Sequence, residues 1–590
     1  MDNLKLHYDV SSDDFSCAGE ASGKIKRTLK DLGLDPNIVR NVAIAVYEGE
    51  INMVIHADGG CIDADIYPDK IKIVLADRGP GIPDVSLAMR EGYSTAPENI
   101  RALGFGAGMG LPNIKKYSDN MNIKTELGVG PEITLLVNIE KPKGGLLMDS
   151  YIFHSVRMDK DKCVGCMNCI KRCPTEAIRV RNGKANIIKE KCIDCGKCIS
   201  VCPHHAKYAD RESLTNIVRF KYRVALPAPA LYGQFNNLDD VNYILCGLKE
   251  LGFDDVFEVS RAAEIVSQIT REKIKNNKTC KPLISSACPA VCRLIRVSYP
   301  TLLPQLLDMN APMEIAAMLA REEAVKKTGL DPKEIGIFFI TPCPAKITAI
   351  KNPLTLDSPV IDGAVAIKDI YPVLVQRMGK LRKNDENIEH LQHSGKIGVS
   401  WATSGGESAA LLCDNYLAAD GIENVKAILN EVEDEKLNGM DFIELNSCTC
   451  GCVGGSLTAE NPFIAKRRLQ MLRKYLPVSC VKYEDNPEDA GILYWQKEPQ
   501  ANNIRRLSDN LKDAMRIMSE INELETKLPK LDCGTCGAPS CKALAEDIVR
   551  GFANIHDCMF CTRNEYMGSH EPEAEIFREI LPAPFRKESE

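Results

Sequence analysis

Residues 163–174 read CVGCMNCIKRCP, and residues 192–203 read CIDCGKCISVCP. Both runs follow one pattern, C-x2-C-x2-C-x3-C-P. Three thiolates at this spacing wrap one cubane of iron and sulfide, while the fourth cysteine of each run binds the other cluster. Zinc is the weaker alternative, because zinc sites normally use two short C-x2-C clips. The pattern therefore predicts a small domain built around two 4Fe-4S clusters.

We expect residues 150–212 to form a bacterial-type ferredoxin domain, which would act as an electron conduit. The first cluster is predicted to bind Cys163, Cys166, Cys169 and Cys202. The second cluster is predicted to bind Cys192, Cys195, Cys198 and Cys173.

Composition and length indicate a globular protein of several domains, with mixed α/β and α+β folds. The 590 residues are too many for one hydrophobic core. A net charge of -7 gives no sign of a nucleic-acid partner. With no long apolar run and an acidic start, we expect a cytoplasmic protein that has no contact with a membrane. Thiols are reduced there, so 25 cysteines point to metal clusters and not to disulfides.

The N-terminal region combines a polar helix face with glycine-rich loops. Residues 42–57, VAIAVYEGEINMVIHA, have an apolar helical pattern. It places three polar side chains on one face: Glu48, Asn52 and His56. An apolar strand follows and ends at Asp77, before Gly79 and Gly81. A second loop precedes another helix and contains Gly104, Gly106, Gly108 and Gly110. Glycine-rich backbone that leads into a helix N-terminus is suited to phosphate.

The ordered set E-x-x-x-N, D-x-G-x-G and G-x-G-x-G-x-G resembles the GHKL ATPase family, most closely its anti-sigma-factor serine kinases. The resemblance implies an α/β sandwich over residues 1–145 that binds ATP and Mg²⁺. Asn52 would hold the magnesium ion, Asp77 would accept from the adenine amino group, and Glu48 would act as base or orient water. The glycine-rich segment would be the ATP lid. Protein phosphorylation, ATP hydrolysis and nucleotide sensing all stay open, and a plain α/β sandwich is the alternative.

The central region, residues 220–500, alternates strand-like apolar runs with helical stretches, which predicts an α/β domain with ligands at strand ends. The strand-like runs are residues 222–231, 281–288, 335–343, 396–404 and 441–448. Three cysteine loops follow such runs: SSACPAVC at 285–292, TPCPAKITAI at 341–350 and ELNSCTCGCVGG at 444–455.

These loops resemble, in their order, the three signature motifs of FeFe-hydrogenases. The resemblance implies a cubane bound by four cysteines, the last of which bridges to a two-iron subsite. The implied ligands are Cys288, Cys343, Cys448 and the bridging Cys452. Lys346 matches the lysine that holds a cyanide ligand of the two-iron site. Glycines that let the backbone approach the cluster would be Gly451, Gly454 and Gly455. Cys450 matches a glycine position and is not expected to bind metal.

The departures from the family pattern fall on the reactive side of the site. Ala287 replaces the cysteine that passes protons in the family, and Ala349 replaces its relaying glutamate. Further changes are Val291, Thr341 and Asn446. Positioned acid–base groups contribute about 10² to 10⁴ in rate, so we expect slow turnover. Such changes resemble the sensory FeFe-hydrogenases. A cubane without the two-iron subsite, as in hydrogenase-like proteins of iron–sulfur assembly, is the alternative.

Residues 501–528 are expected to form a linker helix, and residues 529–565 a small metal module. The helix seam, Ile504, Leu507, Leu511, Ala514, Met518 and Ile521, would pair with a second copy of the chain or pack on its own domain. The module's cysteines, Cys533, Cys536, Cys541 and Cys558, follow C-x2-C-x4-C-x16-C. They resemble the iron–sulfur module of Rnf electron-transport and corrinoid iron–sulfur proteins, which implies a fourth cubane. Zinc is the alternative, and Cys561 competes as a ligand.

Together these features predict a hydrogen or redox sensor in which the metal centres bias the N-terminal ATP-binding domain. Expected partners are a ferredoxin or other hydrogenase subunit as redox partner and a regulatory protein as substrate of the ATP-binding domain. Two alternatives remain: a catalytic hydrogenase subunit of an electron-transfer complex, and an electron-transfer protein with 4Fe-4S clusters only.

Overall fold

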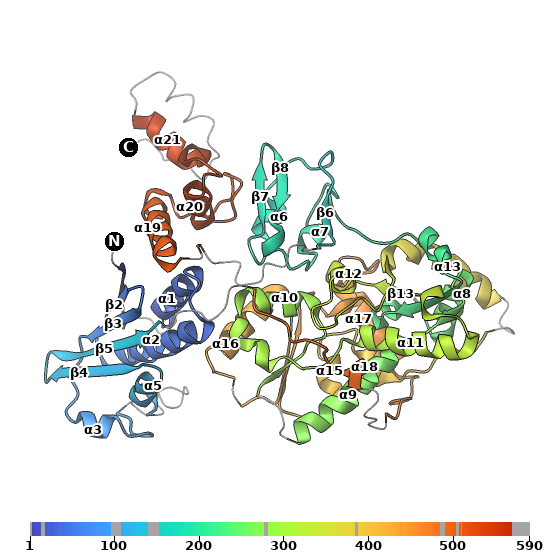
Figure 1. Ribbon diagram of the computed structural model, residues 1–590, viewed down its shortest axis with the longest axis horizontal. Coiled ribbons are helices and arrows are strands. Elements are labelled where there is room, and N and C mark those ends of the chain that lie inside the picture. The colour runs from blue at the N-terminus through green and yellow to red at the C-terminus, as the bar shows by residue number, and fades with distance from the viewer. Residues whose placement is uncertain are drawn as a thin grey trace. The chain divides into compact units, whose positions relative to one another are not determined.

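The computed structural model describes residues 3–12, 18–95, 108–139, 153–276, 281–383, 388–437, 439–483, 490–502, 507–508 and 510–568. The chain divides into two compact units (Figure 1). The first consists of Met1–Met148 and Asn503–Glu590, and the second of Asp149–Asn502. Residues far apart in the sequence, the N-terminal domain and the C-terminal cysteine module, therefore share one unit. No helix in the described residues is both long and apolar enough to cross a membrane.

An antiparallel sheet of five strands forms the base of the first unit. Its strand order is β1-β2-β3-β5-β4. Buried residues alternate with less buried ones along β2 and β3, so one face of the sheet packs against helices α1 and α2. The strands are β1 (Leu4–Val10), β2 (Gly60–Ile66), β3 (Lys70–Asp77), β4 (Asn120–Glu126) and β5 (Gly130–Asn138). The helices are α1 (Glu20–Asp31), α2 (Pro36–His56), α3 (Val85–Ala88) and α5 (Gly110–Lys116).

A buried carboxylate ties α1 to α2. The helix α1 begins after Gly19, which offers no side chain to its first turn. Glu50 of α2 is 2% exposed and accepts from the backbone N–H of Ala21 at 3.0 Å and of Ser22 at 2.9 Å. These bonds satisfy N–H groups that have no partner inside the helix. A shift of α1 along its axis would therefore strain its hydrogen bonds to Glu50 of α2.

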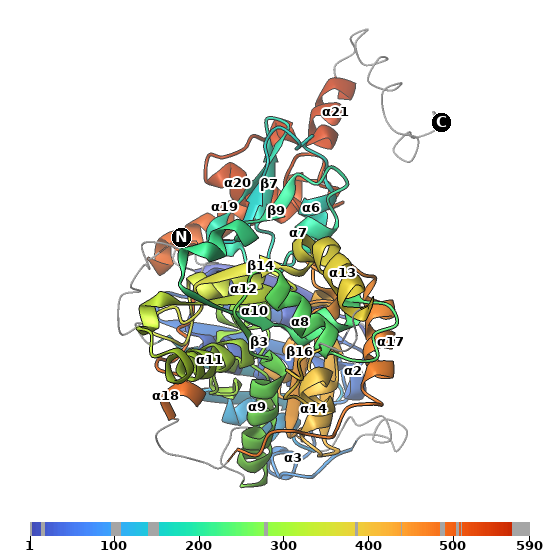
Figure 2. The ribbon, with the colours of Figure 1, turned by 90° about the vertical axis from the view of Figure 1, so that its right-hand side faces the viewer.

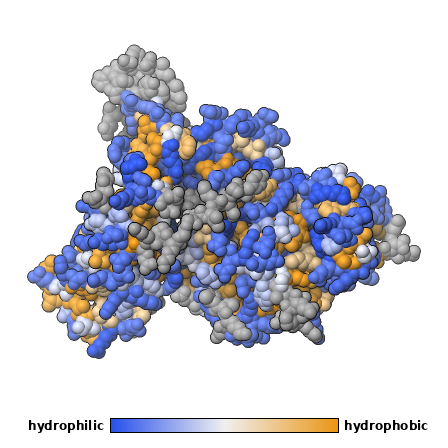
Figure 3. All heavy atoms as spheres, viewed as in Figure 1, coloured by the Kyte–Doolittle hydropathy of each residue, from blue (hydrophilic) through white to orange (hydrophobic). Residues whose placement is uncertain are grey.

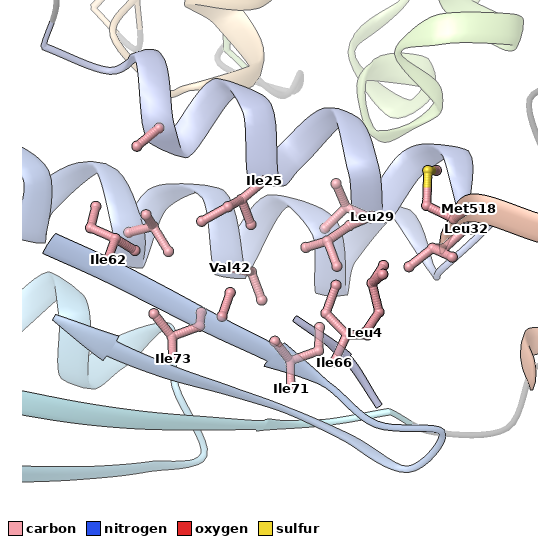
Figure 4. Close-up of a cluster of buried hydrophobic side chains, with 14 of the residues drawn as sticks. Leu4, Ile25, Leu29, Leu32, Val42, Ile62, Ile66, Ile71, Ile73 and Met518 are labelled. Atoms are coloured by element: carbon pink, nitrogen blue, oxygen red, sulfur yellow. The ribbon is translucent and has the colours of Figure 1, made fainter. Parts of the chain in front are cut away.

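The core of this unit extends into the C-terminal helices α19 (Leu511–Lys527), α20 (Cys541–Val549) and α21 (Met559–Gly568). Met518 and Ile521 of α19 are each 1% exposed and belong to the same buried cluster as Leu4 and Leu29. Figure 4 shows Met518 beside Leu32 above the strands. The described residues of the predicted helix seam therefore pack against the chain's own N-terminal domain, which was one of the two alternatives expected from the sequence. Ile504 lies outside the described residues.

The second unit begins with the two short hairpins of the ferredoxin region. Strand β6 pairs with β9, and β7 pairs with β8. A small core of their own includes Ile170, Ile178 and Ala185. The elements are β6 (Val156–Met158), α6 (Asn168–Lys171), β7 (Ile178–Arg181), β8 (Lys184–Ile187), α7 (Lys197–Ser200) and β9 (Lys207–Ala209).

Two parallel sheets form the rest of the second unit, with orders β11-β10-β13-β14 and β12-β16-β15. Helices surround the strands (Figure 2). The strands are β10 (Tyr222–Pro227), β11 (Asp255–Val256), β12 (Leu283–Ile284), β13 (Ile335–Thr341), β14 (Gly363–Ala366), β15 (Tyr416–Asp420) and β16 (Phe442–Asn446). The helices include α8 (Asn242–Glu250), α9 (Val259–Lys275), α10 (Pro289–Ser298), α11 (Pro312–Thr328), α12 (Pro344–Lys351), α13 (Ile367–Lys383), α15 (Gly406–Ala410), α16 (Ile422–Glu433) and α17 (Pro462–Leu472).

One predicted strand is a helix. The run at residues 396–404 was expected to be extended, but it begins with α14 (Lys396–Ser400). Packing against α9 explains the difference, since a Cβ on Gly398 would lie 2.1 Å from the Ser260 carbonyl oxygen. Tertiary contact overrides the strand preference of valine and isoleucine here.

Polar and charged residues cover most of the face seen in Figure 3, with hydrophobic residues between them.

Candidate metal centres and nucleotide site

The cysteines of the first predicted ferredoxin cluster lie together. Cys163 and Cys169 are buried, and the cysteines that the structure describes are free thiols. Burial raises the pKa of Cys169, and the nearby thiols of Cys166, Cys163 and Cys202 raise it further. Cys202 comes from the second run, so the grouping crosses between runs as the motif requires. Four thiols held this close need a cationic partner to ionise, and iron supplies one.

The second group lines a partly open cavity. Its wall contains Cys173, Cys192, Cys195 and Cys198, together with apolar residues such as Ile178 and Ile193. Burial raises the pKa of Cys195 to about 12, and Cys173 from the first run adds to the shift. A cavity with four thiols and apolar side chains in its wall suits a cubane. The wall also carries the buried Asp194, which sequence reasoning missed.

The ferredoxin region is anchored to the second cysteine loop of the central domain. Ser155 Oγ donates to the carbonyl oxygen of Pro344 at 2.7 Å, and Thr348 Oγ1 donates to Ser155 Oγ at 2.8 Å. A Cβ on Gly196 would lie 2.9 Å from Pro344 Cγ. The charge of Cys288, a predicted ligand of the central site, also raises the pKa of Cys195. The second cluster group therefore lies next to the central site.

The central site is built where strands end and helices begin. Cys288 is the N-cap of α10 and Cys343 is the N-cap of α12. Cys448 follows β16, and Cys452 opens a short 3₁₀ helix. Burial raises the pKa of Cys448, and the neighbouring thiols of Cys343, Cys288 and Cys452 add to the shift. All four predicted ligands are thus brought together.

Lys346 lies at the centre of this thiol group. Its Nζ donates to Cys452 Sγ at 3.4 Å. Burial opposes its charge, but the thiolates of Cys452, Cys343 and Cys288 outweigh burial and raise the pKa of Lys346. A buried ammonium surrounded by thiolates can hold an anionic ligand of a metal group.

The glycines of the third loop serve contacts between loops. Gly451 has φ 85°, and a Cβ there would lie 2.6 Å from the backbone nitrogen of Ser404. A Cβ on Gly455 would lie 2.2 Å from the Pro342 carbonyl oxygen, and Gly454 is as tightly packed. Gly455 thus lets the third loop approach the second, and Gly451 lets it approach Ser404. Cys450 is 3% exposed and packs in a hydrophobic core that Cys452 also borders.

The C-terminal cysteines lie on the unit that contains the N-terminal domain. Cys541 begins α20, and its backbone N–H donates to Asp532 Oδ1 at 2.6 Å. Burial raises the pKa of Cys561 to about 11, and Cys558 and Cys541 add to the shift. Three thiols therefore lie together here. Cys533 and Cys536 pack against the same core, so Cys561 competes with them for a place in the ligand set.

Helix α2 and strand β3 present the predicted nucleotide-binding residues. Glu48 Oε1 accepts from Asn113 Nδ2 of α5 at 2.7 Å. Gly110, at the start of α5, approaches Asn52 so closely that a Cβ would lie 3.0 Å from Asn52 Nδ2. The helix after the predicted lid thus packs against the face of α2 that carries Glu48 and Asn52. Gly104 and Gly106 lie outside the described residues.

Asp77 lies at the end of β3. Its Oδ1 accepts from the backbone N–H of Gly79 at 2.8 Å, and burial raises its pKa. Gly81 has φ 83° and Gly108 has φ 76°, a left-handed backbone that favours glycine. An acidic side chain at a strand end next to tight glycine turns can accept from a ligand amino group.

Three family models match the chain. The model for the iron only hydrogenase large subunit, C-terminal domain, matches residues 221–416, which include two of the three cysteine loops. The central domain, called the hydrogenase domain below, is similar to the iron-only hydrogenases over these residues. A 4Fe-4S dicluster domain matches residues 155–203, and an Fe-S cluster family matches residues 528–560.

Proteins similar to this chain include a hydrogenase, a serine/threonine-protein kinase and an iron–sulfur cluster assembly factor. The chain is 25% identical over 377 residues to iron hydrogenase 1 of Clostridium pasteurianum, covering 52% of this chain and 66% of the relative. It thus spans less than two thirds of that hydrogenase. Serine/threonine-protein kinase RsbT of Bacillus subtilis is 30% identical over 112 residues, which cover 18% of this chain and 78% of RsbT. The N-terminal domain belongs to the RsbT kinase family. The cytosolic Fe-S cluster assembly factor oxy-4 of Caenorhabditis elegans is 21% identical over 295 residues, which cover 42% of this chain and 63% of that protein.

The hydrogenase domain lacks proton-carrying side chains at several positions of its reactive side. Val291 is fully buried, and Ala349 is buried in apolar surroundings. Thr341 Oγ1 donates to the Cys343 carbonyl oxygen at 3.0 Å, and Asn446 Nδ2 donates to Glu444 Oε1 at 2.9 Å. The polar replacements are therefore engaged in structural bonds.

A buried carboxyl pair in the hydrogenase domain was not foreseen. Ser285 Oγ donates to Glu407 Oε2 at 2.6 Å, and Ala287 N–H donates to Ser285 Oγ at 3.2 Å. Burial raises the pKa of Glu407, and the charge of Glu444 raises it further. Burial raises the pKa of Glu444 as well, and its hydrogen bonds from two backbone N–H groups, at 2.9 Å each, oppose that shift. A glutamate inside a glycine-rich run, SGGES, was the signal available in the sequence.

Proposed function

We propose that the protein is a hydrogen or redox sensor, in which a slow hydrogenase-family metal site is coupled to an ATP-binding, kinase-like domain of the GHKL type. One observation carries the proposal: the two sides of the central site differ. The ligand side holds four cysteines around Lys346, whereas Val291 and Ala349, buried on the reactive side, carry side chains without exchangeable protons.

The donor set fits a cubane joined to a two-iron subsite. Cys288, Cys343, Cys448 and Cys452 would hold the cubane, and Lys346 would hold an anionic ligand of the subsite. When bound, the two-iron group supplies the metal atoms at which hydrogen is split. Around it, Ala287 offers only a backbone N–H, which already donates to Ser285. A proton therefore leaves slowly, and a slow site suits a reporter of hydrogen better than a bulk catalyst.

The C-terminal module is the element through which the metal state would reach the nucleotide site. Lys542 Nζ, next to Cys541, pairs with Asp31 Oδ2 at 2.8 Å at the end of α1. The Leu507 N–H donates to the Asp31 carbonyl oxygen at 3.3 Å. Because Glu50 ties α1 to α2, contacts run from the cysteine module to the helix that carries Asn52. Coupling requires that these contacts differ between two states of the cluster.

The output is proposed to be ATP-dependent action on a partner protein, or ATP hydrolysis, with Asn52, Asp77 and Glu48 in the roles of magnesium ligand, adenine acceptor and base. A ferredoxin-like redox partner would exchange electrons with the ferredoxin clusters. A catalytic hydrogenase subunit is the second candidate. A protein with cubanes alone is the third, and the similarity to oxy-4 is the observation that supports it.

Infrared spectroscopy of protein made anaerobically with hydrogenase maturation factors tests the proposal. Cyanide and carbonyl bands are expected in the wild type and in the Cys450→Ser variant, and their loss is expected in Cys448→Ser. Absence of the bands in the wild type would remove both hydrogen-based functions. If the bands appear, hydrogen oxidation should be slow in the wild type and faster in Ala287→Cys. Fast turnover by the wild type would favour the catalytic subunit.

A further inference from the structure

A buried lysine lies between the two ferredoxin cysteine groups. Lys207 begins β9 and pairs with Met158 of β6. Lys207 is 3% exposed, and its Nζ has no hydrogen-bond partner within the described residues. Its neighbour Ala206 donates a backbone N–H to Cys202 Sγ at 3.3 Å. An ammonium in such a place is costly unless an anion balances it.

The segment that carries Lys207 packs against cysteines of both groups. Ala206, the residue before it, is 2% exposed and lies in one buried cluster with Cys163 and Cys169 of the first group. Cys198 of the second group packs against the same cluster. The charge of Lys207 acts on Cys169 and on Cys198. The ammonium therefore lies where its charge acts on both groups.

The second group carries an opposing charge. Asp194 is 1% exposed, and its Oδ2 lies 2.7 Å from Nδ1 of the buried His154. Its Oδ1 lies 3.9 Å from Cys192 Sγ, and Asp194 lines the same cavity as Cys195. Among the described residues of the ferredoxin region, no other aspartate or glutamate is buried, so the first group has no such carboxylate beside it.

We propose that the ammonium of Lys207 raises the reduction potentials of both ferredoxin clusters. The increase is larger for the cluster bound by Cys163 and Cys169 than for the other cluster. The step is a one-electron reduction, in which a redox partner gives an electron to a cluster and no bond forms or breaks. The cluster becomes more negative, so a fixed positive charge stabilises the reduced form. The proposal rests on the assignment of these cysteines to two clusters.

A redox titration of the full-length holoprotein, followed by electron paramagnetic resonance, tests the proposal. In Lys207→Met the equilibrium constant for reduction of the first cluster should fall about tenfold, which is 59 mV for a one-electron couple. The second cluster should shift in the same direction by less. Lys207→Arg keeps the charge and should keep both potentials near the wild-type values.

Lys184→Met is the matched control. Lys184 Nζ donates to the Cys163 carbonyl oxygen at 2.7 Å, but the side chain reaches solvent, where its charge is screened. Its charge also acts on Cys163, so its removal should shift the potential of the first cluster, but by less than the removal of Lys207 does. Unchanged potentials in Lys207→Met, or equal shifts in the Met and Arg variants, would overturn the proposal.

Iron analysis separates failure of the inference from failure of the cluster assignment. Wild-type protein without the two ferredoxin signals would overturn the assignment, and the inference with it, while the infrared bands of the central site would still test the sensor. If Lys207→Met assembles no ferredoxin clusters, the proposal requires that Lys207→Arg does. Loss of the clusters in both variants would contradict a role for the charge.

Discussion

The ferredoxin region and the C-terminal module both hold cysteines at cluster spacings, yet they are built into the molecule differently. The ferredoxin region has a core of its own around Ile170 and Ile178 and is anchored to the Pro344 loop of the hydrogenase domain. The C-terminal module places Leu544 and Cys558 in the core of the N-terminal domain. Cysteine groups of similar spacing are thus attached to the hydrogenase domain in one case and to the N-terminal domain in the other.

This difference indicates that the ferredoxin region and the C-terminal module have different roles. A self-contained module beside the hydrogenase loops can exchange electrons without disturbing its surroundings. A module that shares its core with another domain cannot change without affecting that domain, because packed interiors transmit strain. We therefore interpret the ferredoxin region as the electron conduit and the C-terminal module as the link to output.

Removal of one ligand from each module gives the largest expected effect. Cys541→Ser should lose the C-terminal cluster and increase backbone hydrogen exchange in α1 and α19, because cluster binding contributes to folding. Cys198→Ser should lose the second ferredoxin cluster and leave exchange in α1 unchanged. Hydrogen-exchange mass spectrometry of the anaerobic proteins measures both. Unchanged exchange in α1 of the Cys541→Ser variant would remove the distinction.

The shared core can be tested without touching a cluster ligand. Met518→Ala removes a side chain of a residue that is 1% exposed, so the free energy of unfolding of the first unit should fall by about 2–5 kcal/mol. Met471→Ala is the control, since Met471 is 37% exposed and should cost under about 0.5 kcal/mol. Denaturant unfolding provides the values. Equal effects of the two variants would show that α19 does not stabilise the N-terminal domain.

Glu314 should give the second unit a pH-dependent stability. Burial raises the pKa of Glu314 to about 7, above its usual 4.5. The folded state therefore binds more protons than the unfolded state between these values, so the contribution of Glu314 to stability is full below pH 4.5 and is lost as pH rises toward 7. The contribution of Glu314 to the slope should reach about 1.4 kcal/mol per pH unit. Glu314→Gln should reduce the slope in unfolding of the second unit, to which Glu407 also contributes, and an unchanged slope would contradict burial of Glu314 as a cause.

The ion pair between Lys542 and Asp31 should have the smallest effect. Both side chains are partly buried, at 24% and 14% exposed, so Lys542→Met should lower the stability of the first unit by about 1 kcal/mol. The exposed pair of Lys527 with Glu523 is the control, and Lys527→Met should have almost no effect. Unfolding at low and high salt measures both, and equality of the variants would remove the pair from the coupling contacts.

Much of the local structure could be predicted from the sequence. The polar face of residues 42–57 lies on α2, and the apolar run before Asp77 is β3, because periodic apolar residues form elements that bury one face. The helix at residues 396–400 could not be predicted, since the contact of Gly398 with Ser260 depends on tertiary packing.

The cysteine groups could also be predicted, because ligand spacing encodes a metal site directly. The union of the C-terminal module with the N-terminal domain could not, since it depends on how Met518 and Leu29 pack across a long sequence separation. Lys207 and Glu407 were missed for a related reason: a lone charged residue acquires meaning only when its burial is known.

ATP affinity under two gas phases tests the central claim most directly. Holoprotein is equilibrated under hydrogen or under nitrogen, and the Kd for ATP is measured by calorimetry in each case. The sensor account predicts that the two values differ severalfold, that Cys541→Ser abolishes the difference, and that Asn52→Ala loses binding under both gases. Equal Kd values in the wild type, with clusters and infrared bands present, would contradict coupling between the metal centres and the nucleotide domain.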